Sequence, residues 1–487
     1  MMISRRGVLG GLLAGVASPV WAETRPKPRP GSAAARQTAA GPDAAALVAA
    51  ANLGGKTGLV VADARSGQVL EAVEPDAALP PASTAKTITT LYALERLGPA
   101  HRFVTQVLAT GPVAGGIVQG DLVLAGSGDP LLDTDDLGDL AAALKGAGVR
   151  GCTGRYLVWD GALPEIDEIS TDQPDYVGYN PAISGLNLNF NRVYFEWKRQ
   201  KGGWGTSVDA RGERFVPPVS MARVSVADRE TPLFTYRNGQ EAEEWTVAAA
   251  ALGKGGSRWL PVRHPGRYTA EVFHVLARAQ GIDLPAPALV GQRPSGQVLA
   301  QFGSDALPDI LRGMLRHSTN LTAEVMGLSS SGAGRLAASG ATMTDWAADR
   351  LGARGKFVDH SGLGASSRIS ALEFARALVA AQATPMAQTF KAVLRDLGTA
   401  EEGEEGLGGA TRVIGKTGTL NFASSLVGYI QPASGRELVF AILSADTKRR
   451  DGLSMAERES PPGGKAWLRR ARGLQRDLLA RWAGLYA

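Results

Sequence analysis

The pattern of apolar and polar residues divides the chain into a helical first part, a long β-rich middle and a second helical part. Alternating apolar and polar residues around a glycine-containing turn predict a β-hairpin over residues 57–73. Pro80 and Pro81 then end any helix upstream of them. The apolar positions that follow predict a new helix from Ser83 to about Leu97. The first part therefore brings a serine to the start of a helix.

The middle of the chain, residues 99–300, has short apolar runs separated by turn residues. We interpret it as inserted β-rich material in two modules, one nested in the other at about 155–225. Helices are expected within it at 132–146 and 265–281, and a loop-rich stretch at 161–190.

The second helical part begins after residue 304 and ends in a sheet and a long helix. Helical periodicity covers 307–317, the segment after 320, 341–351 and 370–381, and an acidic loop is expected at 403–409. Strands are expected at 412–419, 425–430 and 437–443. The last helix repeats apolar residues from Trp467 to Leu485 at helical spacing, with arginines elsewhere on its surface. Contact with a membrane surface is one interpretation; packing against the sheet is the one we favour, so any membrane contact is at most peripheral.

Ser83 and Lys86 are the first candidates for chemistry. Positions i and i+3 of a helix face the same way, so Lys86 should lie over Ser83 and accept its proton. A serine hydroxyl needs such a base, and a lysine serves only if burial or a nearby cation lowers its pKa. The alternative is a helix-capping serine followed by a surface lysine.

The first 22 residues are typical of an export signal. Arg5 and Arg6 precede a short apolar run, and Val20-Trp21-Ala22 resembles a cleavage site, so we expect a twin-arginine-like signal at 1–22. An uncleaved membrane anchor is the alternative, but the run is short for a span. Residues 23–42, rich in proline and alanine, are expected to be a disordered linker. Export predicts a periplasmic protein.

Charge and cysteine content exclude some functions. The net charge of +5 comes from the two signal-peptide arginines and from residues 23–42, which carry +3, so the remaining chain is neutral and gives no support for nucleic-acid binding. The one cysteine, Cys152, is expected to be a buried strand residue, with a nucleophile as the alternative. The five histidines have no metal-ligand spacing, and we predict no metal and no cofactor.

Two further motifs follow Ser83-x-x-Lys86 in order: Ser318-x-Asn320 and Lys416-Thr417-Gly418. Each is weak alone, but the ordered set resembles the serine penicillin-recognising enzymes. Together with the long insertion and the loop at 359–364, the chain from about Asp43 resembles the class C low-molecular-mass penicillin-binding proteins, of the type-4 carboxypeptidase/endopeptidase kind.

The resemblance implies an α/β (α+β) fold. A transpeptidase-like domain with an antiparallel sheet between helical layers would be built from residues 43–98 and 301–487, with two nested β-rich domains inserted between them. It also implies a serine D-alanyl-D-alanine carboxypeptidase/endopeptidase that acts on peptidoglycan stem peptides and cross-links and is inhibited by β-lactams. Since the motifs lie outside 99–300, we expect the insert to be dispensable for the acylation chemistry but not for folding or substrate choice.

The residues and the resemblance together suggest roles for the site. Ser83 is the nucleophile and Lys86 the base, kept neutral by burial and by nearby Lys416. Ser318 relays the proton to the leaving amine, and Asn320 binds the substrate amide. The residues expected to hold the terminal carboxylate and to border the oxyanion site are Lys416, Thr417, Gly418 and Thr419.

Two positions depart from the family pattern. Thr319 stands where aspartate is common, and His360 stands where a glycine is usual in the 359–364 loop. Two other functions remain as alternatives. A β-lactamase is opposed by the 235-residue spacing from Ser83 to Ser318 and by the lack of a Glu-x-x-Leu-Asn segment after Ser318. A non-catalytic peptidoglycan-binding scaffold is opposed by the presence of both lysines and both serines.

Overall fold

The computed structural model describes residues 41–397, 411–432 and 435–486. The signal expected at 1–22, almost all of the linker expected at 23–42 and the acidic loop expected at 403–409 lie outside the described residues. The first described helix is α1 (Ala44–Ala51), which Asp43 caps by accepting the Ala46 N–H at 2.8 Å.

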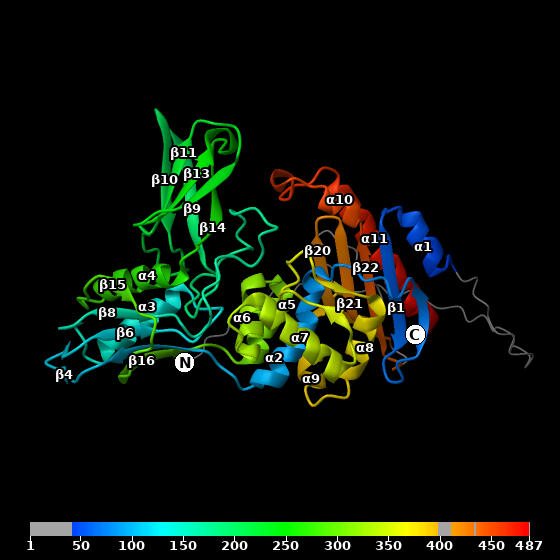
Figure 1. Ribbon diagram of the computed structural model, residues 1–487, viewed down its shortest axis with the longest axis horizontal. Helices are drawn as coiled ribbons and strands as arrows, with labels where there is room; N and C mark the ends of the chain where they lie inside the picture. Colours follow the sequence, from blue (N-terminus) through cyan, green and yellow to red (C-terminus); the bar gives the residue numbers. More distant parts are fainter. Residues whose placement is uncertain (1–40, 398–410, 433–434, 487) are drawn as a thin grey trace, which may run out of the picture. The chain divides into compact units, whose positions relative to one another are not determined.

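A six-stranded antiparallel sheet combines strands from the first and last parts of the chain (Figure 1). In spatial order its strands are β19 (Arg395–Asp396), β20 (Arg412–Leu420), β21 (Ala423–Gln431), β22 (Leu438–Ala445), β1 (Lys56–Asp63) and β2 (Val69–Val73). Strand β1 pairs with β22 along its whole length, from Lys56 opposite Ala445 to Asp63 opposite Leu438. The expected hairpin and the three expected C-terminal strands are confirmed and belong to this one sheet.

Helices cover both faces of the sheet. One hydrophobic core joins the sheet to α2 (Ala85–Leu97), α5 (Leu307–His317), α6 (Asn320–Ser331), α7 (Leu336–Leu351), α8 (Ala371–Ala381) and α9 (Ala387–Val393). A second core on the opposite face joins it to α1 and α11 (Gly464–Tyr486). In β1, Val60 packs in the first core while Leu59 and Val61 pack in the second, as the alternation of a strand buried on both faces requires. The expected sheet between helical layers is confirmed.

The inserted middle contains a second sheet of five strands. These are β15 (Pro287–Leu289), β8 (Tyr156–Trp159), β6 (Leu122–Ala125), β3 (Val104–Ala109) and β16 (Gln297–Gly303). Helices α3 (Thr134–Gly146) and α4 (Pro265–Ala279) share a hydrophobic core with it. A small sheet beside it contains β4 (Val113–Ala114), β5 (Ile117–Val118) and β7 (Gly151–Cys152). The expected β-rich insertion is present.

The nested part of the insert lies later in the chain than we expected. Its two three-stranded sheets are β10 (Gly203–Asp209), β9 (Arg192–Gln200) and β14 (Gly255–Pro261), and β11 (Ala222–Ala227), β13 (Glu243–Ala248) and β12 (Phe234–Asn238). We expected this module at about 155–225, but β8 at its start pairs with β6 in the five-stranded sheet, and β9 pairs with a strand that ends at Pro261. The nested strands thus span residues 192–261, because pairing between distant segments decides which sheet a strand joins. The limits that we expected for the outer domains remain a prediction.

The last helix packs against the central sheet, as favoured. The indole N–H of Trp467 donates to the Leu53 carbonyl at 2.6 Å, and that of Trp482 donates to Glu71 at 2.9 Å. In the part of the chain that the structure describes, no helix has the length and apolar character needed to cross a bilayer. Cys152 lies in a strand, as expected, but is only half-buried, because β7 is a two-residue strand at the edge of its small sheet.

Candidate active site

Ser83 lies in a tight 3₁₀ turn, Ala82–Thr84, immediately before α2, rather than in the α-helix itself. The carbonyl of Pro81 anchors this turn to the sheet, because it accepts hydrogen bonds from the Thr84 hydroxyl at 2.6 Å and the Ser425 hydroxyl of β21 at 2.5 Å. Ala82 adopts a positive φ of 48° at the start of the turn. The prolines therefore end the preceding strand-like segment, and contacts with the sheet hold the serine at the helix start.

Lys86 is fully buried directly behind Ser83, so the alternative of a surface lysine is excluded. Its Nζ donates to Ser83 Oγ at 3.0 Å, to Asn320 Oδ1 at 2.7 Å and to the Ser361 carbonyl at 2.9 Å. Burial lowers the pKa of Lys86 to about 8, against the opposing effect of two nearby carboxyl groups. A lysine with this pKa can exist as a neutral amine in contact with the serine hydroxyl near neutral pH.

Those carboxyl groups, Glu324 and Asp359, are part of the site that the sequence analysis missed. Glu324 accepts the backbone N–H groups of His360 at 2.9 Å and Ser361 at 2.8 Å, and Asp359 accepts those of Gly362 and Gly364. Burial and the nearby charge of Asp359 raise the pKa of Glu324 to about 8, and burial raises that of Asp359. They hold the 359–364 loop, whose Ser361 carbonyl binds Lys86. The signal was available for Glu324, which lies one helical turn after Asn320.

Lys416 meets Ser318 on the other side of the nucleophile. Its Nζ donates to Ser318 Oγ at 3.0 Å and to the Thr417 carbonyl at 2.7 Å. Burial lowers the pKa of Lys416 well below its usual value, and repulsion from Lys86 lowers it further. We expected the charge of Lys416 to lower the pKa of Lys86. That part of the expectation is wrong, since burial accounts for the Lys86 shift and the repulsion falls on the buried Lys416 instead.

Gly418 lets strand β20 approach the nucleophile. A Cβ at this position would lie 2.2 Å from Ser425 Oγ, 2.8 Å from the Pro81 carbonyl oxygen and 3.0 Å from the Ser83 backbone nitrogen. Only glycine fits this contact. Thr419 follows on the strand and lines the cavity over Ser83. The side chain of Thr417 is exposed, and its backbone carbonyl accepts the hydrogen bond from Lys416.

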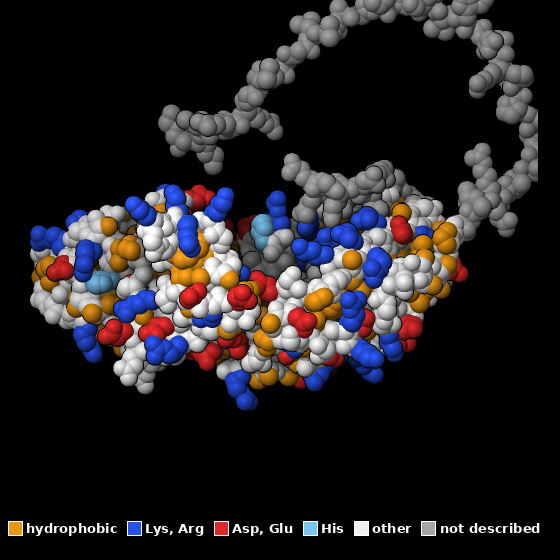
Figure 2. Space-filling view, turned by 90° about the horizontal axis from the view of Figure 1, so that it is seen from above, with side chains coloured by type: hydrophobic (Ala, Val, Ile, Leu, Met, Phe, Trp, Pro, Cys, Tyr) orange, Lys and Arg blue, Asp and Glu red, His pale blue; other side chains and the backbone are white. Residues whose placement is uncertain are grey.

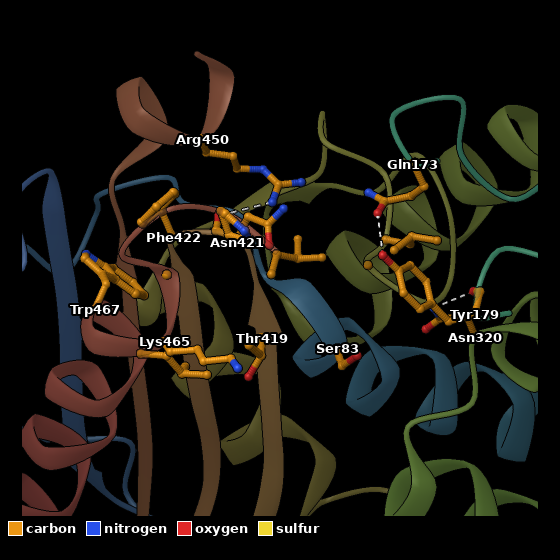
Figure 3. Close-up of a pocket in the computed structure, with 16 residues that line it drawn as sticks. Ser83, Gln173, Tyr179, Asn320, Thr419, Asn421, Phe422, Arg450, Lys465 and Trp467 are labelled. Atoms are coloured by element: carbon orange, nitrogen blue, oxygen red, sulfur yellow. Dashed lines mark hydrogen bonds between the residues drawn. The ribbon is translucent and has the colours of Figure 1, made fainter. Parts of the chain in front are cut away.

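A cavity of about 320 Å³ opens over Ser83, bordered by Asn320 and Thr419 from the two flanking motifs (Figure 3). The inserted middle contributes Tyr179 to its wall, and the Tyr179 carbonyl accepts the Asn320 side-chain N–H at 3.0 Å. Arg450 and Lys465 from the C-terminal part lie on the opposite side. The insert therefore contributes to the wall of the site and positions Asn320, while its dispensability for the acylation chemistry stays a prediction.

His360, in the 359–364 loop, is fully buried. Its Nε2 lies 2.6 Å from Ser339 Oγ, and its ring packs on Gly327, where a Cβ would lie 2.0 Å from the imidazole. Burial lowers the pKa of His360 to about 3, so the ring is neutral. The glycine of α6 provides the space that the larger residue needs.

Comparison with known proteins places the chain in a family. The model of the D-Ala-D-Ala carboxypeptidase 3 (S13) family matches residues 43–459. A D-alanyl-D-alanine carboxypeptidase of Actinomadura is 28% identical over 446 residues, covering 80% of this chain and 78% of its own. A carboxypeptidase of Mycobacterium tuberculosis is 29% identical over 458 residues, covering 89% and 87%.

The fold also matches a solved structure, penicillin-binding protein 4 of Haemophilus influenzae. The two superpose with a TM-score of 0.72 at 22% identity, over 90% of this chain and 99% of that one. The same protein has been solved in complex with a β-lactam. The family match spans both segments of the sheet domain and the insert between them. The chain therefore belongs to the D-Ala-D-Ala carboxypeptidase 3 (S13) family and is a serine-type carboxypeptidase that acts on peptidoglycan.

Proposed function

We propose that Ser83 forms an acyl-enzyme with the penultimate D-alanine of a stem peptide, and that the same site cleaves both terminal D-alanine and D-alanyl cross-links. One observation carries this proposal: the fully buried Lys86 amine lies 3.0 Å from Ser83 Oγ and has a lowered pKa. Burial thus provides the base that a serine nucleophile requires.

In the first step Ser83 Oγ attacks the carbonyl carbon and its proton passes to the neutral Lys86 amine. The Ser83 backbone N–H, at the start of α2, faces β20 next to Gly418 and is one donor for the developing oxyanion; the Thr419 N–H is the other. Asn320 is fixed by Lys86 and by the Tyr179 carbonyl, and so presents its amide to the peptide.

In the second step the C–N bond breaks and the proton that Lys86 received passes through Ser318 to the leaving amine, which returns Lys86 to its neutral form; Lys416 holds Ser318 at 3.0 Å. When a terminal carboxylate binds beside Lys416, its charge favours protonation of that lysine, so Thr419 and the Lys416 ammonium together hold the carboxylate. Water then hydrolyses the ester on Ser83 and restores the enzyme.

The wider setting is also part of the proposal. The export signal expected at 1–22 would place the mature protein in the periplasm, where stem peptides and cross-links are its substrates. β-Lactams would acylate Ser83 as substrate mimics, which the β-lactam complex of the Haemophilus structure supports. A β-lactamase would differ in releasing the opened β-lactam rapidly.

Replacing the nucleophile tests the proposal most directly. We expect Ser83→Ala to abolish labelling by a fluorescent penicillin and D-alanine release from pentapeptide, because no other group accepts the acyl chain. Gel fluorescence and product chromatography measure both. Ser66→Ala, which alters an exposed serine of the β1–β2 turn, is the matched control and should label as the wild type does. Labelling that persists in Ser83→Ala would place the nucleophile elsewhere.

The pH dependence of acylation should reflect Lys86. With a pKa of about 8, the amine is protonated below this pH, so the acylation rate should rise about tenfold per pH unit up to about 8 and then level off. Stopped-flow acylation by a chromogenic β-lactam measures the profile. Because the pKa of Glu324 is also raised to about 8, the amine must be assigned separately. Lys86→Cys alkylated to the less basic thialysine should move the limb to lower pH; an unmoved limb would assign it to another group.

A further inference from the structure

A second cavity lies on the far side of Asn320 from the cavity over Ser83. It measures about 130 Å³ and runs between the insert, which contributes Phe190 and Arg192, and the start of α6, which contributes Ser318 and Thr319. Tyr179 and Asn320 border both cavities and are joined by the 3.0 Å hydrogen bond between them. The two cavities therefore share this bridge as a common wall, and Ser83 lines the first of them.

Arg192 lines the second cavity without an anionic partner. Its guanidinium lies 5.1 Å from the ring centre of Phe190 and 5.3 Å from that of Trp259. Its Nε is buried and has no hydrogen-bond partner, and within residues 41–397, 411–432 and 435–486 it forms no ion pair. Burial lowers the pKa of Arg192, and the one opposing effect comes from Tyr268. A cation held between two aromatic rings at a cavity wall is arranged to receive an anion.

The opposite wall also favours an anion. Thr319 precedes helix α6 without capping it, and its hydroxyl is buried with no partner among the described residues. Helix α6 has twelve residues and no side-chain cap at its start, and an uncapped helix start favours a negative charge near it. Thr319 brings no negative charge to this wall, so it does not repel an incoming anion.

The position of the cavity indicates which part of the substrate enters it. Ser318 lies on its wall and accepts a hydrogen bond from Lys416. In the proposed mechanism the leaving amine takes its proton through this serine. The leaving group of a carboxypeptidase reaction is a single D-alanine. The leaving group of a cross-link is a whole second stem peptide, which carries further carboxylates.

The geometry points to a subsite in which Arg192 and the Thr319 end of α6 bind a carboxylate of the second stem peptide, on the amine side of a cross-link. This inference rests on the proposed function and adds the residues that favour cross-links over single stems. Arg192 is a specificity-determining residue of the insert, and the nested β9–β10–β14 sheet holds it in place.

The test compares two purified substrates, a cross-linked muropeptide dimer and a pentapeptide monomer. Arg192→Gln should lower kcat/KM for dimer cleavage roughly 10- to 100-fold, the loss typical of one charge-assisted hydrogen bond. D-Alanine release from the monomer and acylation by penicillin should stay within about twofold. Arg192→Lys should recover part of the dimer activity. Arg199→Gln is the matched control, because Arg199 stands on the same strand but stacks on Trp204, away from the cavity.

A dimer whose second stem has amidated carboxylates gives an independent measurement on the wild-type protein. It should be cleaved as slowly as the normal dimer is by Arg192→Gln, and Arg192→Gln should show no further loss on it. Thr319→Asp should also lower dimer cleavage selectively. These two measurements decide the matter if Arg192→Gln does not fold.

Unchanged dimer cleavage in Arg192→Gln, equal losses on dimer and monomer, or indifference to amidation would each overturn the subsite. A wild-type protein that is acylated and releases D-alanine but leaves dimers intact would also overturn it, while leaving the carboxypeptidase mechanism in place. Absence of acylation would instead refute the mechanism itself.

Discussion

Lys86→Arg is expected to lower the rate of Ser83 acylation by at least about 10³-fold, the upper range for loss of a general base. Arginine stays protonated at all accessible pH values, so it cannot accept the serine proton. Lys86 is fully buried, and the pKa of about 8 is what allows it to be neutral there. The measurement is the acylation rate with a chromogenic β-lactam between pH 6 and 10, beside a thermal melt.

The larger guanidinium could disturb packing in this buried position, so Lys86→Met provides a second variant. Methionine has similar length and no charge, and it keeps the apolar volume of the lysine stem. The matched control is Lys391→Arg, because Lys391 pairs with Glu437 at 2.6 Å, away from the site, where the positive charge is all that matters. A folded Lys86→Arg or Lys86→Met protein that acylates within about tenfold of the wild type would show that another group is the base.

Gly418→Ala is expected to lower acylation about 100-fold or more and to reduce the free energy of unfolding by about 1–3 kcal/mol. The added methyl would lie 2.8 Å from the Pro81 carbonyl and 3.0 Å from the Ser83 nitrogen, both backbone atoms that cannot turn aside. Strand β20 must therefore move away from the serine, which separates the two N–H donors of the oxyanion site. Misplacement of this size costs an enzyme about two orders of magnitude in rate.

Acylation kinetics and chemical denaturation measure the two effects of Gly418→Ala. Gly303→Ala, at the end of strand β16, is the control, since an added Cβ there meets no atom within 4 Å. If Gly418→Ala acylates normally, close contact between β20 and the Ser83 turn is not needed for catalysis. If stability falls without loss of the acylation rate, the glycine serves packing alone.

Local sequence accounts for much of the site. The spacing of Ser83 and Lys86 on one helical turn, and the order of the three motifs, predicted the residues that the structure brings together at 2.7–3.0 Å. The role of Asp359 was missed because it comes from the loop that Asp359 holds, and a loop contact has no periodicity to read. Glu324 was missed although its position one helical turn after Asn320 could have indicated it. The role of Asn320 was predicted, but its hydrogen bond to the Tyr179 carbonyl of the insert was not. Every residue has a backbone carbonyl, so the residue type does not indicate such a contact.

The nested module shows the same limit in the fold. Some strands of the insert were expected from their apolar residues, yet the module was placed too early, because β8 gives no local sign of pairing with β6 rather than with β9. The sheet that a strand joins depends on which strands, distant in the sequence, the folded chain brings beside it.

The sequence by itself determined the family, the nucleophile, its base and the layered sheet domain, because these depend on residue spacing along single helices and strands. Only the tertiary structure decided which group sets the pKa of Lys86 and which elements build the site. The burial of Lys86 depends on all the residues packed around it. This burial, rather than the repulsion expected from Lys416, lowers the pKa of Lys86. The Arg192 guanidinium, which forms no ion pair with any described residue, is likewise recognised only once the insert and α6 lie on either side of one cavity.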